Sequence, residues 1–369
     1  MVDNIFIGLM TGTSADSLDC AAINFLDDEM CILGLKNYDI PNKLKDQIKE
    51  NTQADELDSI KIKELDVSLG IFFSNSIKNF LKSLSLDVEQ ITAIGSHGQT
   101  IKHEPQSINP FSLQVGDPQI VSNILGIKTI GKFRDDDIAS GGQGAPLSPI
   151  FHKEVFFNSL EERIIANIGG ITNISIISNQ ELIGFDTGPG NCLLDAWHKE
   201  NLGGDYDKDG IWAKSGKVNK YLLEVMMNDG YFKSNYPKST GPDYFNLRWL
   251  RRYLEEVNQE ISANDIQATL AELTALSLAN SLNDIDHKSE YIYFCGGGIH
   301  NLDLQERIKK NVEQICVTTS DLGVDPDYLE AICFAWLAKQ RIDGIKFNMK
   351  EITGSNEEVY LGKVFDPVK

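Results

Sequence analysis

Residues 164–191 read IIANIGGITNISIISNQELIGFDTGPGN, and this stretch decides the fold. Apolar β-branched residues fill its first part, and apolar residues alternate with Thr, Asn and Ser in its second part. Such patterns are typical of strands, and the turns Gly169-Gly170 and Asn179-Gln180 separate them. The stretch therefore predicts three short strands followed by an amphipathic helix: 164–168, 171–177, 182–185 and 192–200.

Two features of this stretch point to chemistry. Gly169-Gly170 ends the first predicted strand, and glycines at a strand end let a ligand approach the backbone and direct N–H groups at an anion. The helix start behind Asn191 adds partial positive charge to the same place. Asp186 stands where the third strand is expected to leave the sheet, which is where α/β proteins place catalytic groups. We expect a nucleotide phosphate and a catalytic carboxylate here; a plain turn and a helix-capping Asp are the alternatives.

The same pattern occurs near the N-terminus. Three strands are predicted there: 4–10, 18–26 and 30–38. A turn of small residues, Thr11 to Asp16, separates the first two. The chain is therefore predicted to contain an internal duplication, in which two small-residue turns clasp a phosphate chain. A third turn, Gly296-Gly297-Gly298, follows a predicted buried strand and is assigned to the nucleoside.

Composition limits the class of protein. The chain has 369 residues, of which 41% are hydrophobic, and this length suggests two domains. The net charge of −20 argues against binding to nucleic acid or to an anionic membrane, because both need a surplus of Lys and Arg. The N-terminus lacks the pattern of a signal peptide, and no apolar run approaches the ~20 residues of a membrane span. Six scattered cysteines without a C-x-x-C pair indicate reduced thiols of a cytosolic protein.

Motif searches exclude two common nucleotide sites. No G-x-G-x-x-G supports a Rossmann site, and no G-x-x-x-x-G-K-[ST] supports a P-loop, so paired β-turns must hold the phosphates. His97 and His103 have the wrong spacing for a metal pair, and His97 is assigned to hydrogen bonding with a substrate. The run Asp205 to Gly210 begins like an EF-hand loop, but Gly216 stands where a bidentate Glu is needed. We interpret this run as an acidic turn.

A charged, glycine-rich segment separates the two predicted halves. Arg134 is a candidate to bind a substrate oxygen, and Asp135 to Asp137 are interpreted as a solvated or capping run. Residues 140–146 are predicted to be the crossing between domains. Glu330 lies on the last predicted helix, over 325–343, where a surface role is the simplest interpretation.

Eight motifs, in order from about residue 5 to 340, resemble the signatures of anhydro-N-acetylmuramic acid kinases. They are GLMTGTSADSLD (8–19), GSHGQT (95–100), FRD (133–135) with GGQGAPL (141–147), IGGITN (168–173), FDTGPGN (185–191), KSTG (238–241), CGGG (295–298) and EA (330–331). The ordered set is highly specific, although each motif alone is modest. One departure is that the family usually has Leu-Asp-Gly where this chain has Ala15-Asp16-Ser17. Ser17 would crowd the backbone if its φ were positive.

The resemblance implies an α/β protein with the two-domain sugar kinase/Hsp70/actin fold, a duplicated ribonuclease H-like fold with a central cleft. The expected domains are residues 1–133 and 134–344, with a tail, 345–369, that returns to the first. The resemblance also implies a homodimer in the bacterial cytoplasm. The implied reaction converts 1,6-anhydro-N-acetylmuramic acid, ATP and water into N-acetylmuramic acid 6-phosphate and ADP, with Mg²⁺, in peptidoglycan recycling and amino-sugar catabolism.

Residue roles carry over motif by motif. Asp186 is then the general base that activates water for attack at the anomeric carbon, and ring opening frees the 6-oxygen to take the γ-phosphoryl group. The sugar would be contacted by His97, Gly98, Gln99, Arg134 and Glu330. ATP would be bound by Gly12, Thr13, Ser14, Ala15, Asp16, Ser17, Leu18, Asp19, Gly169, Gly170, Asn173, Gly296, Gly297 and Gly298. Asp16 and Asp19 are the expected Mg²⁺ ligands, and Asp186 remains a third candidate.

Two other functions stay open at this stage. One is an actin- or Hsp70-like nucleotide switch, because fold alone does not fix function. The other is a kinase of the same fold for a different sugar. The polar residues from His97 to Thr100, together with Arg134, favour a kinase, since a pure switch needs no second polar site beside the phosphates.

Overall fold

The chain divides into two compact units. Unit 1 comprises Met1–Phe151 and Tyr328–Lys369, and unit 2 comprises His152–Asp327. The computed structural model describes residues 4–12, 15–26, 29–54 and 56–368. The chain thus crosses between units after residue 151 rather than after 133, and residues 328–344, predicted for the second domain, lie in unit 1.

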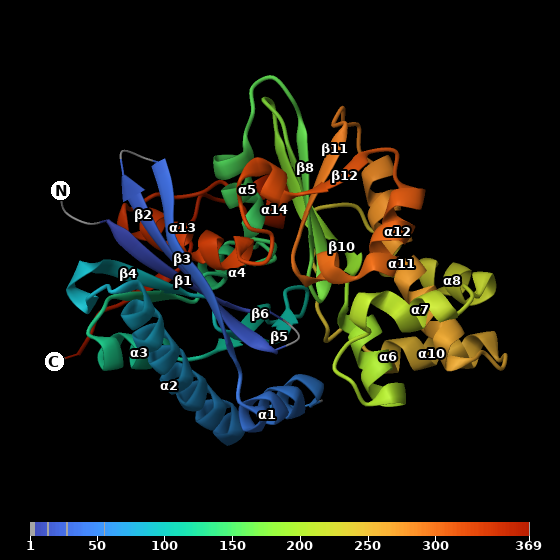
Figure 1. The fold of residues 1–369 in the computed structure, drawn as a ribbon, viewed down its shortest axis with the longest axis horizontal. Coiled ribbons are helices and arrows are strands. Elements are labelled where there is room, and N and C mark those ends of the chain that lie inside the picture. The colour runs from blue at the N-terminus through green and yellow to red at the C-terminus, as the bar shows by residue number, and fades with distance from the viewer. Residues whose placement is uncertain (1–3, 13–14, 27–28, 55, 369) are drawn as a thin grey trace. The chain divides into compact units, whose positions relative to one another are not determined.

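Unit 1 is built on a six-stranded mixed sheet with the order β13-β7-β4-β1-β2-β3 (Figure 1). Its strands are β1 (Ile5–Thr11), β2 (Ser17–Leu26), β3 (Glu29–Asp39), β4 (Ile91–Ser96), β7 (Thr129–Gly131) and β13 (Lys363–Phe365). The first three form an antiparallel meander, and β4 and β7 extend it as parallel strands. β13 pairs antiparallel with β7, so the C-terminal tail is part of unit 1. A separate hairpin joins β5 (Gln99–Glu104) to β6 (Phe111–Val115).

Helices cover the sheet of unit 1 because its strands are apolar on both faces. They are α1 (Asn42–Gln53), α2 (Ser59–Leu84), α3 (Pro118–Leu125), α4 (Asp135–Ala139), α13 (Leu329–Ile342) and α14 (Lys350–Thr353), and the crossing to unit 2 falls inside α5 (Ser148–Phe156). The apolar stripe of α2, which includes Leu69, Phe73 and Ile77, shares one core with Ile7 and Leu9 of β1.

α13 packs on β1 and β4 at backbone distance through two glycines. A Cβ on Gly8 would lie 1.8 Å from the Ala331 carbonyl oxygen, and one on Gly95 would lie 2.0 Å from the Phe334 carbonyl oxygen. No larger residue fits at either place without moving the helix. In Figure 1 the red α13 lies against the blue strands accordingly. This contact fixes the first turn of α13, which carries Glu330.

The glycine-rich segment after α4 belongs to unit 1 and is not the predicted crossing. The Gln143 N–H donates to the Thr353 carbonyl oxygen at 2.9 Å, and the Asn356 N–H donates to the Ser140 carbonyl oxygen at 3.0 Å. The buried Asp137 carboxylate accepts bonds from the Gly144 N–H and the Thr353 hydroxyl, each at 2.7 Å. These bonds tie the segment to the C-terminal part of the chain, a partner that lies more than 200 residues away in sequence.

Unit 2 repeats the topology of unit 1. Its sheet has the order β10-β9-β8-β11-β12, from β8 (Arg163–Ile168), β9 (Ile171–Ile177), β10 (Leu182–Pro189), β11 (Tyr291–Cys295) and β12 (Ile315–Thr318). Three antiparallel strands are again followed by two parallel ones on the side of the first strand. The internal duplication and the α/β fold class predicted from the two meanders are confirmed.

The helices of unit 2 form two cores. They are α6 (Cys192–Leu202), α7 (Ile211–Ser215), α8 (Lys220–Met227), α9 (Gly230–Lys233), α10 (Leu247–Val257), α11 (Ala263–Asn283) and α12 (Leu302–Asn311). Leu278 and Leu282 of α11, with Leu304 and Ile308 of α12, pack on one face of the sheet. The first half of α11 packs in a second core with α6, α8 and α10. Single 3-10 turns lie at Val88–Gln90, Lys208–Gly210, Gly297–His300 and Thr319–Leu322.

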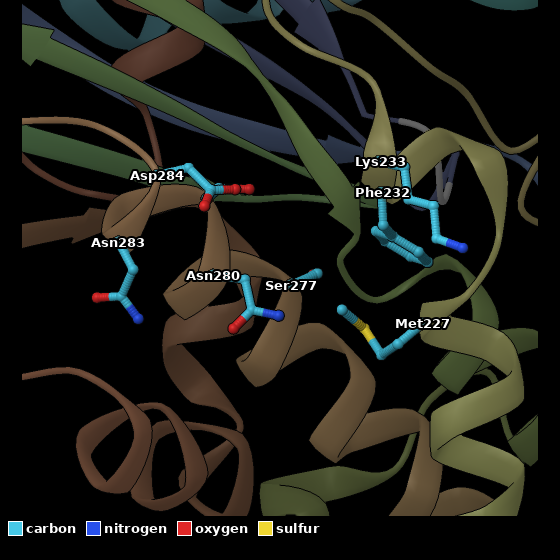
Figure 2. A pocket seen from close by; sticks show the side chains of 8 residues that line it. Met227, Phe232, Lys233, Ser277, Asn280, Asn283 and Asp284 are labelled. Atoms are coloured by element: carbon cyan, nitrogen blue, oxygen red, sulfur yellow. The ribbon is translucent and has the colours of Figure 1, made fainter.

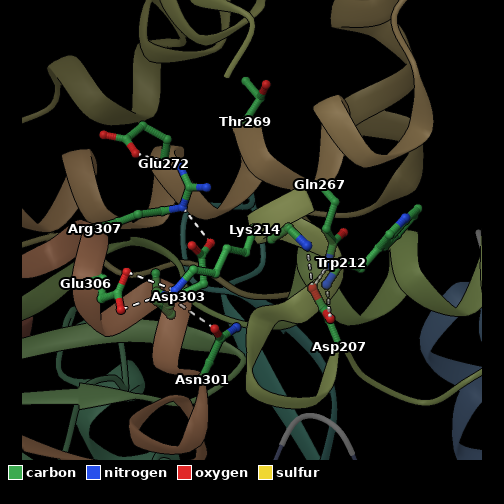
Figure 3. A network of polar contacts seen from close by, with 12 residues as sticks. Asp207, Trp212, Lys214, Gln267, Thr269, Glu272, Asn301, Asp303, Glu306 and Arg307 are labelled. Atoms are coloured by element: carbon green, nitrogen blue, oxygen red, sulfur yellow. Dashed lines mark hydrogen bonds and ion pairs between the residues drawn. The ribbon is translucent and has the colours of Figure 1, made fainter. Parts of the chain in front are cut away.

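The acidic run at 205–210 is a capping turn in this helical layer. The Asp207 carboxylate accepts from the backbone N–H groups of Trp212 and Ala213 at 2.9 and 2.8 Å, and so caps α7 (Figure 3). Nearby, Arg307 of α12 binds Asp303 and Glu272 at 2.7 and 2.9 Å, which joins α12 to α11. Within the described ranges no helix is long and apolar enough to cross a membrane.

Candidate functional site

Three polar side chains form a row across the meander of unit 2. The strand registers pair Asn167 of β8 with Asn173 of β9, and Asn173 with Asp186 of β10. Ile168, Ile174 and Phe185 beside them belong to the core under α11 and α12, so the row occupies the opposite face. The Asn167 Oδ1 atom is buried without a hydrogen-bond partner in the protein. We call Asn167, Asn173 and Asp186 the polar row.

Asp186 is nearly buried and is held on its backbone and its side chain. It is 5% exposed, and its Oδ2 atom accepts a bond from the Thr240 N–H at 2.9 Å. The sequence predicts that this strand ends at Phe185. In the structure β10 continues to Pro189, with a register shift between Asp186 and Gly188. The irregularity is a β-bulge, which bends a strand and turns a side chain out of the regular ladder. Asp186 thus lies inside a bulged edge strand rather than in a loop.

The Gly169-Gly170 turn makes a different contact from the one predicted. Its carbonyl oxygens accept from Gly190, Asn191 and Cys192 N–H groups at 2.9 to 3.0 Å, so the start of α6 is bonded to the turn. A Cβ on Gly190 would lie 2.3 Å from the Gly169 carbonyl oxygen, which explains the glycine. These three N–H groups at the start of α6 are therefore used inside the protein.

The Gly296-Gly297-Gly298 turn lies beside the first turn. β11 is parallel to β8, and Cys295 pairs with Asn167, so the turns after both strands share one edge of the sheet. A Cβ on Gly296 or Gly298 would meet Asn167 or Ile168 within 2.3 Å, whereas a Cβ on Gly297 would meet nothing within 4 Å. The backbone at Gly297 is thus open to a ligand.

In unit 1, the buried His97 pairs with the half-buried Arg134. The His97 Nδ1–H donates to the Gly98 carbonyl oxygen at 2.8 Å, so Nε2 is the acceptor, and it receives the Arg134 guanidinium at 2.9 Å. Burial, together with the Arg134 charge, holds the pKa of His97 well below its usual range. Arg134 also reaches the Gly144 carbonyl oxygen at 3.3 Å. Both nitrogens of the neutral His97 ring are therefore occupied within the protein.

The residues next to His97 carry further unpaired polar atoms. Gln99 is 1% exposed, and its Oε1 atom has no protein partner; the same holds for the Ser96 hydroxyl. The Gly98 carbonyl oxygen accepts the Thr11 hydroxyl at 3.0 Å, which joins this loop to the end of β1. Buried polar atoms without partners are uncommon, and a bound ligand is one explanation for them.

The turn of unit 1 that is predicted to bind phosphate is described only in part, because Thr13 and Ser14 lie outside the described residues. Ala15 has a φ of 55° and donates its N–H to the Gly12 carbonyl oxygen at 3.1 Å. Ser17 and Leu18 begin β2 in extended conformation. Ser17, which replaces the usual glycine of the family, therefore does not crowd the backbone. The left-handed residue of this turn is Ala15 instead.

Asp16 and Asp19 are the acidic residues of this turn. Asp16 lies 3.7 Å from the Lys45 ammonium, and Asp19 accepts the Ser17 hydroxyl at 3.2 Å. No group of three or more His, Cys, Asp or Glu side chains converges anywhere among the described residues. One or two carboxylates suit Mg²⁺ that arrives with substrate phosphates, whereas an all-protein cage needs more.

A polar pocket of about 270 Å³ lies between α9 and α11. Figure 2 shows Phe232 and Lys233 on one wall and Ser277, Asn280 and Asp284 on the other. None of these residues belongs to the sequence motifs. Burial lowers the pKa of Lys238, and the negative charge of Asp284 opposes this.

The duplicated sheets and the polar row define the class of protein. Two units with the same strand order, three antiparallel strands followed by two parallel ones, are the mark of the sugar kinase/Hsp70/actin fold. The family model for anhydro-N-acetylmuramic acid kinase matches residues 4–367, and the chain belongs to this family.

Proteins named anhydro-N-acetylmuramic acid kinase are similar over their whole lengths. The protein from Coxiella burnetii is 42% identical, and the match covers 98% of this chain and 97% of the relative. The protein from Pasteurella multocida is 42% identical, and the match covers 99% of this chain and 97% of the relative. The protein from Saccharophagus degradans is 40% identical, over 100% of both.

Two solved structures match at low similarity. A reductive activator for a corrinoid, iron-sulfur protein has a TM-score of 0.46 at 13% identity, over 95% of this chain and 63% of that chain. A ROK family glucokinase from Streptomyces griseus in complex with glucose and AMPPNP has a TM-score of 0.38 at 13% identity. That match covers 91% of this chain and 100% of the glucokinase chain. The fold assignment rests on the strand order of this chain rather than on these matches.

Proposed function

We propose that this chain is an ATP-dependent kinase that opens the ring of 1,6-anhydro-N-acetylmuramic acid and phosphorylates its 6-oxygen. The products are N-acetylmuramic acid 6-phosphate and ADP, as peptidoglycan recycling and amino-sugar catabolism require. Membership of the family over residues 4–367 and the names of the full-length relatives support the reaction. The ordered motifs of both units support it further.

The observation that carries the proposal is the Asp186 carboxylate in the polar row. The bond from the Thr240 N–H favours the ionised carboxylate, which is the form that accepts a proton. Asp186 takes a proton from water as the water oxygen attacks the anomeric carbon. The bond between that carbon and the 6-oxygen breaks, and the 6-oxygen displaces ADP from the γ-phosphorus. A positioned base of this kind contributes a factor of about 10²–10⁴ to the rate.

Arg134 is the proposed sugar contact in unit 1, and His97 holds it. A neutral His97 with both nitrogens occupied orients the guanidinium more readily than it binds a ligand itself. The unpaired Gln99 Oε1 atom can accept from a sugar hydroxyl. Gly98 and Glu330 complete the proposed contacts, with Glu330 placed by the packing of α13 on Gly8.

ATP is proposed to use the small-residue turns of both units. Gly297 has open space above its backbone, and Asn173 lies in the polar row beside the Gly169-Gly170 turn. In unit 1 the segment from Gly12 to Asp19 provides the corresponding turn. Asp16 and Asp19 would hold Mg²⁺, which when bound neutralises charge on the transferred phosphoryl group.

Asp186→Asn tests the base. We expect turnover to fall at least 100-fold while ATP binding, measured by calorimetry, changes less than threefold, because the amide cannot accept the proton. Asp205→Asn is the matched control, since Asp205 is an exposed partner of Lys199 in the same unit. Turnover within tenfold of wild type in Asp186→Asn would contradict the assignment.

We further propose a homodimer in the bacterial cytoplasm. The reaction consumes ATP, which is a cytoplasmic substrate, and the family resemblance implies the dimer. Light scattering on the purified chain gives the mass directly: twice 41.1 kDa supports the dimer, and a single 41.1 kDa species excludes it. Fractionation of cells tests the compartment.

A further inference from the structure

Residues 229–240 hold Asp186 at its backbone as well as its side chain. The Tyr231 hydroxyl donates to the Asp186 carbonyl oxygen at 2.6 Å, and the Asp186 N–H donates to the Lys238 carbonyl oxygen at 3.1 Å. The Thr240 N–H adds the carboxylate bond. β10 is the edge strand of its sheet and is irregular at this residue. The 229–240 segment therefore supplies the partners that the ladder lacks there.

The segment is anchored by Asp229, a buried carboxylate outside the polar row. Its Oδ1 atom accepts from the Tyr231 N–H at 2.9 Å and from the Tyr244 hydroxyl at 2.6 Å. Its Oδ2 atom accepts from Trp249 Nε1, the Tyr253 hydroxyl and Arg252, at 2.7 to 3.0 Å. Burial raises the pKa of Asp229, but these hydrogen bonds outweigh it and leave the pKa lowered. An ionised carboxylate with so many donors fixes the start of α9 against α10.

The ammonium of Lys238 contacts Tyr231 from the other end of the segment. It is 7% exposed, and its Nζ atom lies 4.9 Å from the Tyr231 ring centre and 5.8 Å from the Phe185 ring centre. Nζ donates to the Tyr231 carbonyl oxygen at 3.3 Å. Burial lowers the pKa of Lys238, and the negative charges of Asp284 and Asp186 oppose this. The ammonium thus joins residue 238 to Tyr231, and Asp284 lines the pocket of Figure 2.

We propose that Tyr231 is a positioning residue for Asp186: its hydroxyl, bonded to the Asp186 carbonyl oxygen, fixes the direction of the bulge. The inference rests on the proposed role of Asp186 as the base. A displacement of about 1 Å at a reacting group costs up to ~100-fold in rate, so a bond that orients the bulge has a measurable kinetic effect. Tyr231 bonds to the backbone of Asp186 and does not touch the reacting atoms.

Tyr231→Phe tests the hydroxyl, and Tyr244→Phe is its control. Both variants remove one hydroxyl from the same aromatic cluster, but only Tyr231 bonds to Asp186. We expect kcat to fall about tenfold in Tyr231→Phe, with the KM for ATP unchanged, and to stay within twofold of wild type in Tyr244→Phe. Equal kcat values for the two variants, with similar losses of stability, would overturn the role of Tyr231.

The outcomes separate this inference from the proposed function. If Asp186→Asn keeps its turnover, the base assignment itself is wrong. If Asp186→Asn is inactive while Tyr231→Phe behaves as wild type, the base stands and the positioning role of Tyr231 falls.

Discussion

Replacing Gly8 by Ala tests the packing that places α13 against the sheet of unit 1. The added Cβ would lie 1.8 Å from the Ala331 carbonyl oxygen and 2.5 Å from the Ala335 nitrogen. Both are backbone atoms of α13, so no side chain can rotate to relieve the clash. Either the helix or the strand must move by roughly 1.5 Å to reach van der Waals distance.

The expected cost follows from the atoms involved. An extra methyl group in a close-packed core costs typically about 1–3 kcal/mol, and backbone movement on both sides puts Gly8→Ala at the upper end, ~3 kcal/mol. Because about 1.4 kcal/mol corresponds to a factor of ten, the opening equilibrium of this region should rise about 100-fold. A Cβ added to Gly230, at the first position of α9, would meet nothing within 4 Å, and Gly230→Ala should be neutral or slightly stabilising.

Hydrogen exchange followed by mass spectrometry reads this change locally. Peptides from α13, residues 329–342, should exchange about 100-fold faster in Gly8→Ala, whereas peptides from α11 in unit 2 should keep their wild-type rates. The kcat should fall as well, since Glu330 lies in the first turn of α13. A change below fivefold in α13, or an equal change in α11, would refute the packing argument.

Three further predictions address the site and the buried histidines. His97→Gln should raise the KM for the sugar about tenfold and leave the KM for ATP unchanged, because Arg134 loses its partner; equal effects on both substrates would count against this. Gly297→Val should raise the KM for ATP about tenfold without lowering the unfolding free energy, since the side chain enters open space; an unchanged KM would remove Gly297 from the ATP site. Burial lowers the pKa of His103 and His152 to about 3, so these rings stay neutral in the folded chain while the unfolded chain binds protons below ~6.5. The unfolding free energy should therefore fall from pH 6.5 downward, by about 2 kcal/mol for each ring at pH 5. In urea titrations, His152→Asn should lose about 2 kcal/mol less unfolding free energy than the wild type between pH 7 and 5. An equal loss in the variant would contradict the lowered pKa of His152.

The meanders could be predicted from sequence because their signals are local. β-branched alternation and glycine turns placed the second strand of unit 2 at residues 171–177, as found, and the repeated pattern gave the duplication. The end of β10 was missed because a bulge keeps Asp186 within the strand, and no propensity marks a bulge.

Contacts between distant segments could not be predicted. The pairing of Gln143 with Thr353 places the glycine-rich segment in unit 1, although its composition is typical of a linker. Asn167 was not singled out, because its significance comes from its strand register with Asn173 and Asp186. Tyr231 and Asp229 likewise became visible only through bonds across the fold. The proposed sugar and ATP contacts remain predictions from the motifs.

The most direct test of the central claim is release of ADP by the purified chain with Mg-ATP, with and without 1,6-anhydro-N-acetylmuramic acid. We expect strong stimulation by the sugar and a product that is both a reducing sugar and a 6-phosphate ester. ATP turnover that is indifferent to the sugar would contradict the account and favour a nucleotide switch, and stimulation by a different sugar alone would contradict the assigned substrate.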